Sequence, residues 1–161
     1  LKSQAISEIM SDSTCIVAEG EVLQLINQRD PDTTEQRYMD VIYSKTAQLF
    51  VAATETGAEL GNPVYRPAMK KYAVHFGAAF QIIDDIMDYT SSAEEMGKNV
   101  GDDLAEGKPT LPLIQAIKTS ATAQAQLIKD AIKTVVKDNQ LNIFYAGDGN
   151  WNLKNKNIWL R

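Results

Sequence analysis

Three aspartates interrupt an otherwise apolar stretch, FGAAFQIIDDIMDY, at residues 76–89. With about 3.6 residues per turn, Gln81, Asp84 and Asp88 fall on one stripe of a helix, and Asp85 lies at its border. Much of the remaining circumference is apolar: Ile82, Ile83, Ile86 and Met87. We therefore expect a largely buried helix that carries a cluster of carboxylates. Because buried carboxylates without a counter-charge are costly, a cation should face them, and Mg²⁺ is the obvious candidate.

The length and charge of the chain limit what it can be. Its 161 residues suffice for one well-buried domain. A net charge of −5 and the scatter of its lysines and arginines argue against nucleic-acid binding. The apolar runs are too short to cross a bilayer and the start has no signal-peptide layout, so we expect a cytoplasmic protein without a transmembrane segment.

Cysteine and histidine each occur once. Cys15 cannot form an internal disulfide, and its isolation excludes a cysteine-based zinc site and fits a reducing compartment. His75 lies at helical spacing among small and aromatic residues, which favours a packing or surface role. Without a second histidine, a metal site built on a histidine pair is excluded.

The first half of the chain is expected to form two helices. Apolar residues at spacings of three and four run from residue 5 to about residue 28. Thr33 and Gln36 then make a capping box, which starts a long helix that ends at Gly57 or Gly61.

The aspartate-bearing helix is expected at residues 64–89, with Pro67 near its first turn. Small residues on it would let a neighbouring helix approach closely: Ala73, Gly77, Ala78 and Ala79. A polar, glycine-rich loop is expected at 90–109, followed by helices at 110–119 and 122–137. With no strand pattern in the body of the chain, the economical architecture is an all-α fold of long helices.

Residues 139–161 differ from everything before them. They hold six asparagines and both tryptophans of the chain, and they show neither helical nor strand periodicity. Two interpretations stay open: a surface extension of this protein, or an unrelated ending that begins near Gln140. We therefore divide the chain into a domain at 1–138 and an atypical tail at 139–161.

Three further segments could act together with the aspartates. Lys45-Thr46 adjoins an apolar run, although a lysine there could simply extend to solvent. The segments 97–102, GKNVGD, and 106–110, EGKPT, place glycine beside lysine, a pattern that suits an anion but is also common in solvated turns. Taken together with the aspartates, these segments indicate a site in which carboxylates hold Mg²⁺ while the metal and lysines hold a diphosphate.

At this point the sequence resembles a known family. FQIIDDIMDY and GKNVGDDLAEGKPTLPLI look like the second aspartate-rich motif and the following loop of the trans-isoprenyl diphosphate synthases. YSKTAQLF resembles the Lys-Thr segment of that family, and AEGEVLQL at 18–25 resembles a helix between its two aspartate-rich motifs. The order and spacing of the motifs also agree. The resemblance covers roughly residues 1–138 and is strongest to bacterial, octaprenyl-type synthases.

The resemblance implies an isoprenoid synthase fold, here partial, with long antiparallel helices around a central cavity. It also implies a Mg²⁺-dependent prenyl transfer, in which an allylic diphosphate condenses with isopentenyl diphosphate to give a long-chain polyprenyl diphosphate. Asp84 would then bind Mg²⁺ directly, and Asp85 and Asp88 would contribute directly or through water.

The same resemblance implies roles for residues outside the aspartate cluster. Lys45 and Lys98 would hold the allylic diphosphate, and Thr46 and Gln81 would line the reacting end of the pocket. The secondary candidates are Lys108, for substrate binding, and Asp102.

The first aspartate-rich motif of the family should lie before residues 18–25, and it is not in this sequence. We therefore expect a partial synthase with weak or no prenyl transfer by itself, acting as a homodimer or in association with a full-length synthase. One alternative is a non-catalytic subunit or partner of a complete synthase. Another is a plain helical bundle whose aspartates pair with Lys70, Lys71 or another basic residue.

Overall fold

The structure is a computed structural model that describes residues 3–90, 101–134, 143–145 and 151–153. Its described elements are α1 (Gln4–Asn27), α2 (Glu35–Ile42), the π-helix η1 (Tyr43–Ala47), α3 (Gln48–Gly61), the 3₁₀ turn η2 (Pro63–Tyr65), α4 (Arg66–Thr90), α6 (Asp102–Ala105), α7 (Leu111–Thr119), α8 (Thr122–Lys133), β1 (Ile143–Tyr145) and β2 (Trp151–Leu153). The prediction of an all-α fold of long helices is confirmed, and the two short strands, β1 and β2, lie within the tail at 139–161.

The described residues fall into two compact units. The first lies within residues 1–25 and 39–82, and the second within 26–38 and 83–161. Three helices, α1, α2 and α4, contribute residues to both units.

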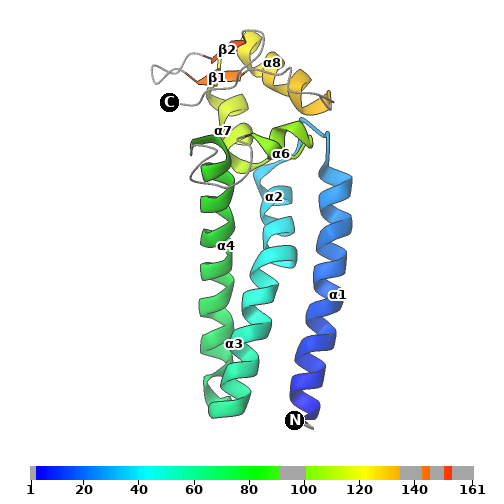
Figure 1. The fold of residues 1–161 in the computed structure, drawn as a ribbon, viewed down its shortest axis with the longest axis vertical. Helices are drawn as coiled ribbons and strands as arrows, with labels where there is room; N and C mark the ends of the chain where they lie inside the picture. The colour runs from blue at the N-terminus through cyan, green and yellow to red at the C-terminus, as the bar shows by residue number, and fades with distance from the viewer. Residues whose placement is uncertain (1–2, 91–100, 135–142, 146–150, 154–161) are drawn as a thin grey trace. The chain divides into compact units, whose positions relative to one another are not determined.

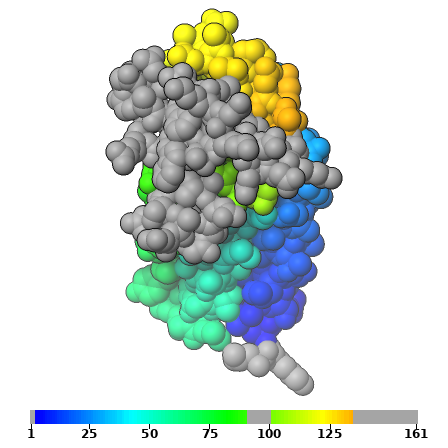
Figure 2. Space-filling view, turned by 45° about the horizontal axis from the view of Figure 1, so that its top comes forward, coloured from blue at the N-terminus to red at the C-terminus, as the bar shows by residue number. Residues whose placement is uncertain are grey.

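In the first unit, three helical segments run antiparallel to their neighbours (Figure 1). The side chain of Gln48 on α3 donates a hydrogen bond to Ser13 on α1, at 2.9 Å, and the α1 and α3 surfaces adjoin in Figure 2. At the turn into α4, the Asn62 side chain accepts a hydrogen bond from the Val64 amide at 3.2 Å. Asn62 thereby caps η2, and the proline at the first position of that turn has no amide to satisfy.

The second unit has an apolar core at which four helices meet. The end of α4 contributes Tyr89 and α6 contributes Leu104, while α7 and α8 supply the other members: Leu113, Ala116, Ile128, Ala131 and Ile132. A backbone hydrogen bond of 2.8 Å from Arg29 to Gly107 ties the segment after α1 to the segment after α6. Both residues have positive φ, 64° for Arg29 and 74° for Gly107. This backbone conformation strains a residue with a side chain, such as Arg29, but not a glycine.

The expected start of the second long helix is displaced by one residue. Thr34, rather than Thr33, accepts a hydrogen bond from the Arg37 amide, at 3.2 Å, and α2 begins at Glu35. The hydroxyl of Thr33 instead donates to the Asp30 carbonyl at 2.9 Å, within the preceding turn. Both threonines suit a cap, and the turn engages the first of them.

Two further expectations need correction. The long helix after residue 34 is not α-helical throughout, because η1 separates α2 from α3. The segment expected as a loop at 90–109 contains the short helix α6, while residues 91–100 lie outside the described part of the chain. Within the tail at 139–161, the described residues pair as an antiparallel hairpin, with Ile143 opposite Leu153 and Tyr145 opposite Trp151.

Candidate functional site

Two of the three carboxylates on α4 are buried. Asp88 is fully buried, Asp85 is 4% exposed, and Asp84 is half-buried. By contrast, three of the apolar residues expected to be buried are exposed: Ile83, Ile86 and Met87. The expectation of a buried apolar face was therefore wrong for this end of the helix. The physical reason is that Asp85 and Asp88 have hydrogen-bond donors inside the second unit.

The donor to Asp85 is a tyrosine that the sequence did not single out. The hydroxyl of Tyr38, in the first turn of α2, donates a hydrogen bond of 2.6 Å to Oδ2 of Asp85, and both groups are buried. Burial, together with the negative charge of Asp85, holds the pKa of Tyr38 far above its ordinary value. The hydroxyl therefore remains a donor at physiological pH.

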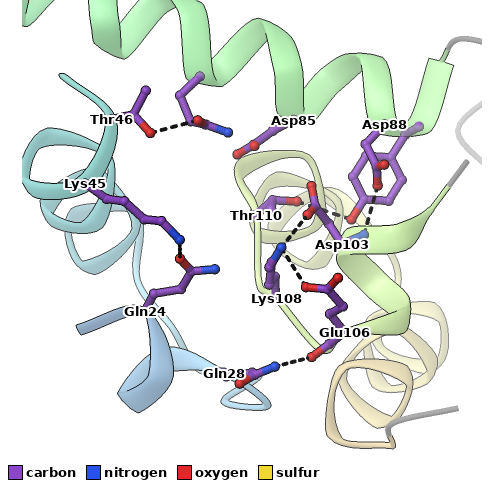
Figure 3. A network of polar contacts seen from close by, with 12 residues as sticks. Gln24, Gln28, Lys45, Thr46, Asp85, Asp88, Asp103, Glu106, Lys108 and Thr110 are labelled. Atoms are coloured by element: carbon purple, nitrogen blue, oxygen red, sulfur yellow. Dashed lines mark hydrogen bonds and ion pairs between the residues drawn. The ribbon is translucent and has the colours of Figure 1, made fainter. Parts of the chain in front are cut away.

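Asp88 is bound to the segment that follows it. Its Oδ2 accepts a hydrogen bond from the Asp103 backbone amide at 3.1 Å (Figure 3). Its carbonyl accepts one from the Gly101 amide at 2.9 Å. Asp103 lies in the first turn of α6, whose N-cap is Gly101 with φ 83° and no capping side chain. Asp88 thus supplies the acceptor that a glycine N-cap cannot offer.

Lys108 lies close to two acidic side chains. Its Nζ is 3.2 Å from Oδ1 of Asp103 and 2.7 Å from Oε2 of Glu106 (Figure 3). Burial lowers the pKa of Lys108, but the hydrogen bonds and charges of these carboxylates outweigh it, so the pKa lies above its ordinary value. The side-chain amide of Gln28 donates to the Glu106 carbonyl at 2.7 Å. The segment 106–108 is therefore held by the hydrogen bond from Gln28 and by the ion pairs of Lys108.

In the first unit, η1 carries the Lys-Thr pair. Nζ of Lys45 lies 2.5 Å from Oε1 of Gln24 and 2.6 Å from Oε2 of Glu21, both on α1. The hydroxyl of Thr46 donates to Oε1 of Gln81, on α4, at 2.8 Å (Figure 3). The structure therefore brings together two residues that the sequence selected, Thr46 and Gln81. The acidic partner of Lys45 was missed.

Two glycines flank this π-helical turn. A Cβ atom on Gly20 of α1 would lie 2.8 Å from the Lys45 amide nitrogen, and one on Gly77 of α4 would lie 2.6 Å from Cα of Ala47. The expectation that small residues on α4 permit a close helix approach is thus confirmed at Gly77. Short π-helical segments inside α-helices are frequent at functional sites.

Four other residues that the sequence singled out differ in where they lie. Lys98 lies outside the described residues, and Asp102 is half-buried in the first turn of α6. Lys70 lies 3.8 Å from Glu55, so its described ion pair is not with the aspartates, as the plain-bundle alternative required. His75 is exposed, which agrees with a surface role.

The donor set suits Mg²⁺ in chemistry but not as an all-protein cage. Within residues 3–90 and 101–134, no three carboxylate, histidine or cysteine side chains lie close enough together to hold a metal ion. Mg²⁺ is usually bound by one or two carboxylates together with water and substrate phosphates. Asp84 and Asp85 fit that pattern. Among the described helices, none is long and apolar enough to cross a membrane.

Comparisons with known proteins match this arrangement. The all-trans-nonaprenyl-diphosphate synthase (geranyl-diphosphate specific) of Rhodobacter capsulatus is 57% identical over 125 residues, covering 77% of this chain and 38% of the relative. The octaprenyl diphosphate synthase of Escherichia coli is 50% identical over 135 residues, covering 83% of this chain and 42% of that relative.

A solved structure has the same fold. The polyprenyl synthase of Caulobacter crescentus, complexed with calcium and isoprenyl diphosphate, aligns with a TM-score of 0.69 at 35% identity, over 81% of this chain and 45% of that one. This chain spans about two fifths of the length of its curated relatives, at 38% and 42%. The sequence profile of the polyprenyl synthetase family matches residues 1–145, and the chain belongs to that family.

Proposed function

We propose that this chain carries the second Mg²⁺ and diphosphate half-site of a long-chain polyprenyl diphosphate synthase, which condenses an allylic diphosphate with isopentenyl diphosphate. The observation that carries the proposal is the family match over residues 1–145, which includes α4, η1 and the 101–110 segment. The names of the relatives, nonaprenyl and octaprenyl synthases, support a long-chain product. The calcium and isoprenyl diphosphate in the related structure support a divalent metal beside a diphosphate.

The roles of the carboxylates follow from their burial. Asp84 is the most accessible of the three and is proposed as a direct ligand of Mg²⁺. Asp85 and Asp88 are buried and accept hydrogen bonds from Tyr38 and the Asp103 amide, and we propose that they contribute to the metal site directly or through water. When bound, Mg²⁺ supplies positive charge where the departing diphosphate becomes more negative.

Lys45, Lys98 and Lys108 are proposed to hold diphosphate oxygens. The Lys45 side chain is 38% exposed and its partner Glu21 is 53% exposed. An ion pair as exposed as this one is worth about 0–1 kcal/mol, so a diphosphate can compete for Lys45 at little cost. The hydrogen bond from Thr46 fixes the Gln81 amide, which we propose lines the reacting end of the pocket.

The alternative is a non-catalytic partner of a complete synthase. Against it stands a third, half-buried carboxylate, Asp84, on α4 next to Asp85 and one turn before Asp88, because like charges gathered on one stretch of helix are destabilising unless a cation faces them. We propose that the chain alone transfers prenyl groups weakly or not at all. Turnover of farnesyl and isopentenyl diphosphates by the purified chain would contradict this part.

The proposal is tested by calorimetric titration of inorganic pyrophosphate into the purified chain, with and without Mg²⁺. We expect binding that requires Mg²⁺ and is lost in Asp84→Ala. The matched control is Asp12→Ala, which removes an exposed carboxylate on α1 and should bind like the unaltered chain. Binding that persists in Asp84→Ala would overturn the proposed half-site. Co-purification with a full-length synthase would favour the subunit alternative.

A further inference from the structure

We propose that Tyr38 is a positioning residue for Asp85: its hydroxyl holds the Asp85 carboxylate in the one orientation in which it can serve a divalent cation. This inference rests on the proposed function, since it assigns Asp85 to the metal. It concerns a residue that lies 47 positions before Asp85 in the sequence and outside every motif described above.

The contact is short and enclosed. Tyr38 is 6% exposed, and its hydroxyl lies 2.6 Å from Oδ2 of Asp85, which is 4% exposed. A hydrogen bond from a hydroxyl to an ionised carboxylate at such a distance belongs to the strong, charge-assisted class. Exclusion of water strengthens it further.

The tyrosine is itself fixed in place. Its ring is buried, so the position of the hydroxyl follows from two side-chain torsions that packing restricts. Tyr38 therefore connects the start of α2 with the carboxylate of α4, within the second unit.

An aspartate without such a fixed donor samples several rotamers. Metal binding must then restrict the side chain to one of them, and the lost conformational entropy lowers the metal affinity. Outer partners that orient metal ligands typically contribute roughly 10- to 100-fold to metal affinity. The Tyr38 hydroxyl binds Oδ2 of Asp85, one acceptor among the roughly four lone-pair sites of an ionised carboxylate.

The second unit offers a matched control for Tyr38. Tyr89 is also a buried tyrosine whose hydroxyl makes a hydrogen bond, but its partner is Oγ1 of Thr110 at 3.2 Å. Tyr38→Phe and Tyr89→Phe each delete one buried hydroxyl and keep the ring. A merely structural role for Tyr38 predicts that both variants behave alike, whereas a positioning role predicts that they differ at Asp85.

The test uses the full chain, Mg²⁺ and inorganic pyrophosphate. For Tyr38→Phe we expect Mg²⁺-dependent pyrophosphate binding to weaken by roughly tenfold, and for Tyr89→Phe no change. In Asp85→Asn, the further removal of the Tyr38 hydroxyl should cause much less additional loss than in the unaltered chain. Equal affinities for Tyr38→Phe and the unaltered chain would overturn the positioning role while leaving the proposed function intact.

A second readout needs no metal. Three-bond side-chain couplings of Asp85, measured by NMR on the metal-free chain, should report a single χ1 rotamer in the unaltered chain and in Tyr89→Phe, and averaged rotamers in Tyr38→Phe. Unchanged couplings in Tyr38→Phe would overturn the inference even if the chain bound no pyrophosphate at all. Absence of pyrophosphate binding with averaged couplings would instead locate the failure in the proposed function.

Discussion

Two glycines of the first unit, Gly77 and Gly57, should respond in opposite ways to replacement by alanine: the first change should destabilise the chain and the second should stabilise it. At Gly77, a Cβ atom would lie 2.6 Å from Cα and 3.0 Å from Cβ of Ala47. Carbon atoms in ordinary contact are about 3.5–4.0 Å apart, so α4 and η1 would have to separate by about 1 Å. The atom that obstructs the new methyl group belongs to the backbone, which cannot rotate away.

The magnitude follows from two competing effects. Overpacking of a close contact costs about 1–3 kcal/mol, while alanine gains about 0.4–1 kcal/mol over glycine in a helix. Gly77→Ala should therefore destabilise the chain by about 1–2 kcal/mol. At Gly57, on α3, a Cβ atom meets nothing within 4 Å, so Gly57→Ala keeps only the gain and should stabilise by about 0.5–1 kcal/mol.

Thermal unfolding followed by circular dichroism measures both variants under one set of conditions. For a chain of this length, 1 kcal/mol corresponds to about 2–4 °C in Tm. We expect Tm to fall for Gly77→Ala and to rise for Gly57→Ala. An unchanged or raised Tm for Gly77→Ala would refute the close packing of α4 against η1 and with it the placement of Thr46 beside Gln81. A fall for Gly57→Ala would contradict only the expected gain at that exposed position.

Two further predictions concern the second unit. Asp88→Ala leaves the Asp103 amide at the start of α6 without its acceptor and should lower the free energy of unfolding by about 1–3 kcal/mol. Asp88→Asn keeps an acceptor oxygen and should lower it clearly less. Equal urea midpoints for the two variants would contradict the capping role. The hydrogen bond and charge of Lys118 lower the pKa of Glu35 below its ordinary 4.5, so this contact contributes above that pH and is lost as the pH falls through the depressed pKa. An NMR titration should show the Glu35 pKa return towards 4.5 in Lys118→Met, and an unmoved pKa would exclude the contact in solution.

The sequence was a good guide where a single helix decides the outcome. Spacing alone placed Gln81 and the three aspartates on one helix, because helical geometry is local. It also suggested that small residues near Gly77 permit close packing. Family resemblance added the link between Thr46 and Gln81, which a hydrogen bond of 2.8 Å now joins.

The sequence was a poor guide where the outcome depends on partners far along the chain. Which face of α4 is buried depends on the donors to Asp85 and Asp88, and nothing in the local sequence singles out Tyr38 as one of them. The π-helical turn at 43–47 packs against glycines from two other helices, which no local propensity encodes. The short helix α6 likewise has its acceptor on α4 rather than at its own N-cap.

The central claim is that the carboxylates near the end of α4 hold a divalent metal together with a diphosphate. Its most direct test is a crystal structure of the chain grown with Mn²⁺, in place of Mg²⁺, and pyrophosphate, in which anomalous scattering locates the metal. We predict an anomalous peak at coordination distance from Asp84, with the Tyr38 hydroxyl still bonded to Asp85 and pyrophosphate oxygens completing the coordination. Pyrophosphate bound in the crystal with Mn²⁺ absent from Asp84, or bound only to other carboxylates, would contradict the claim.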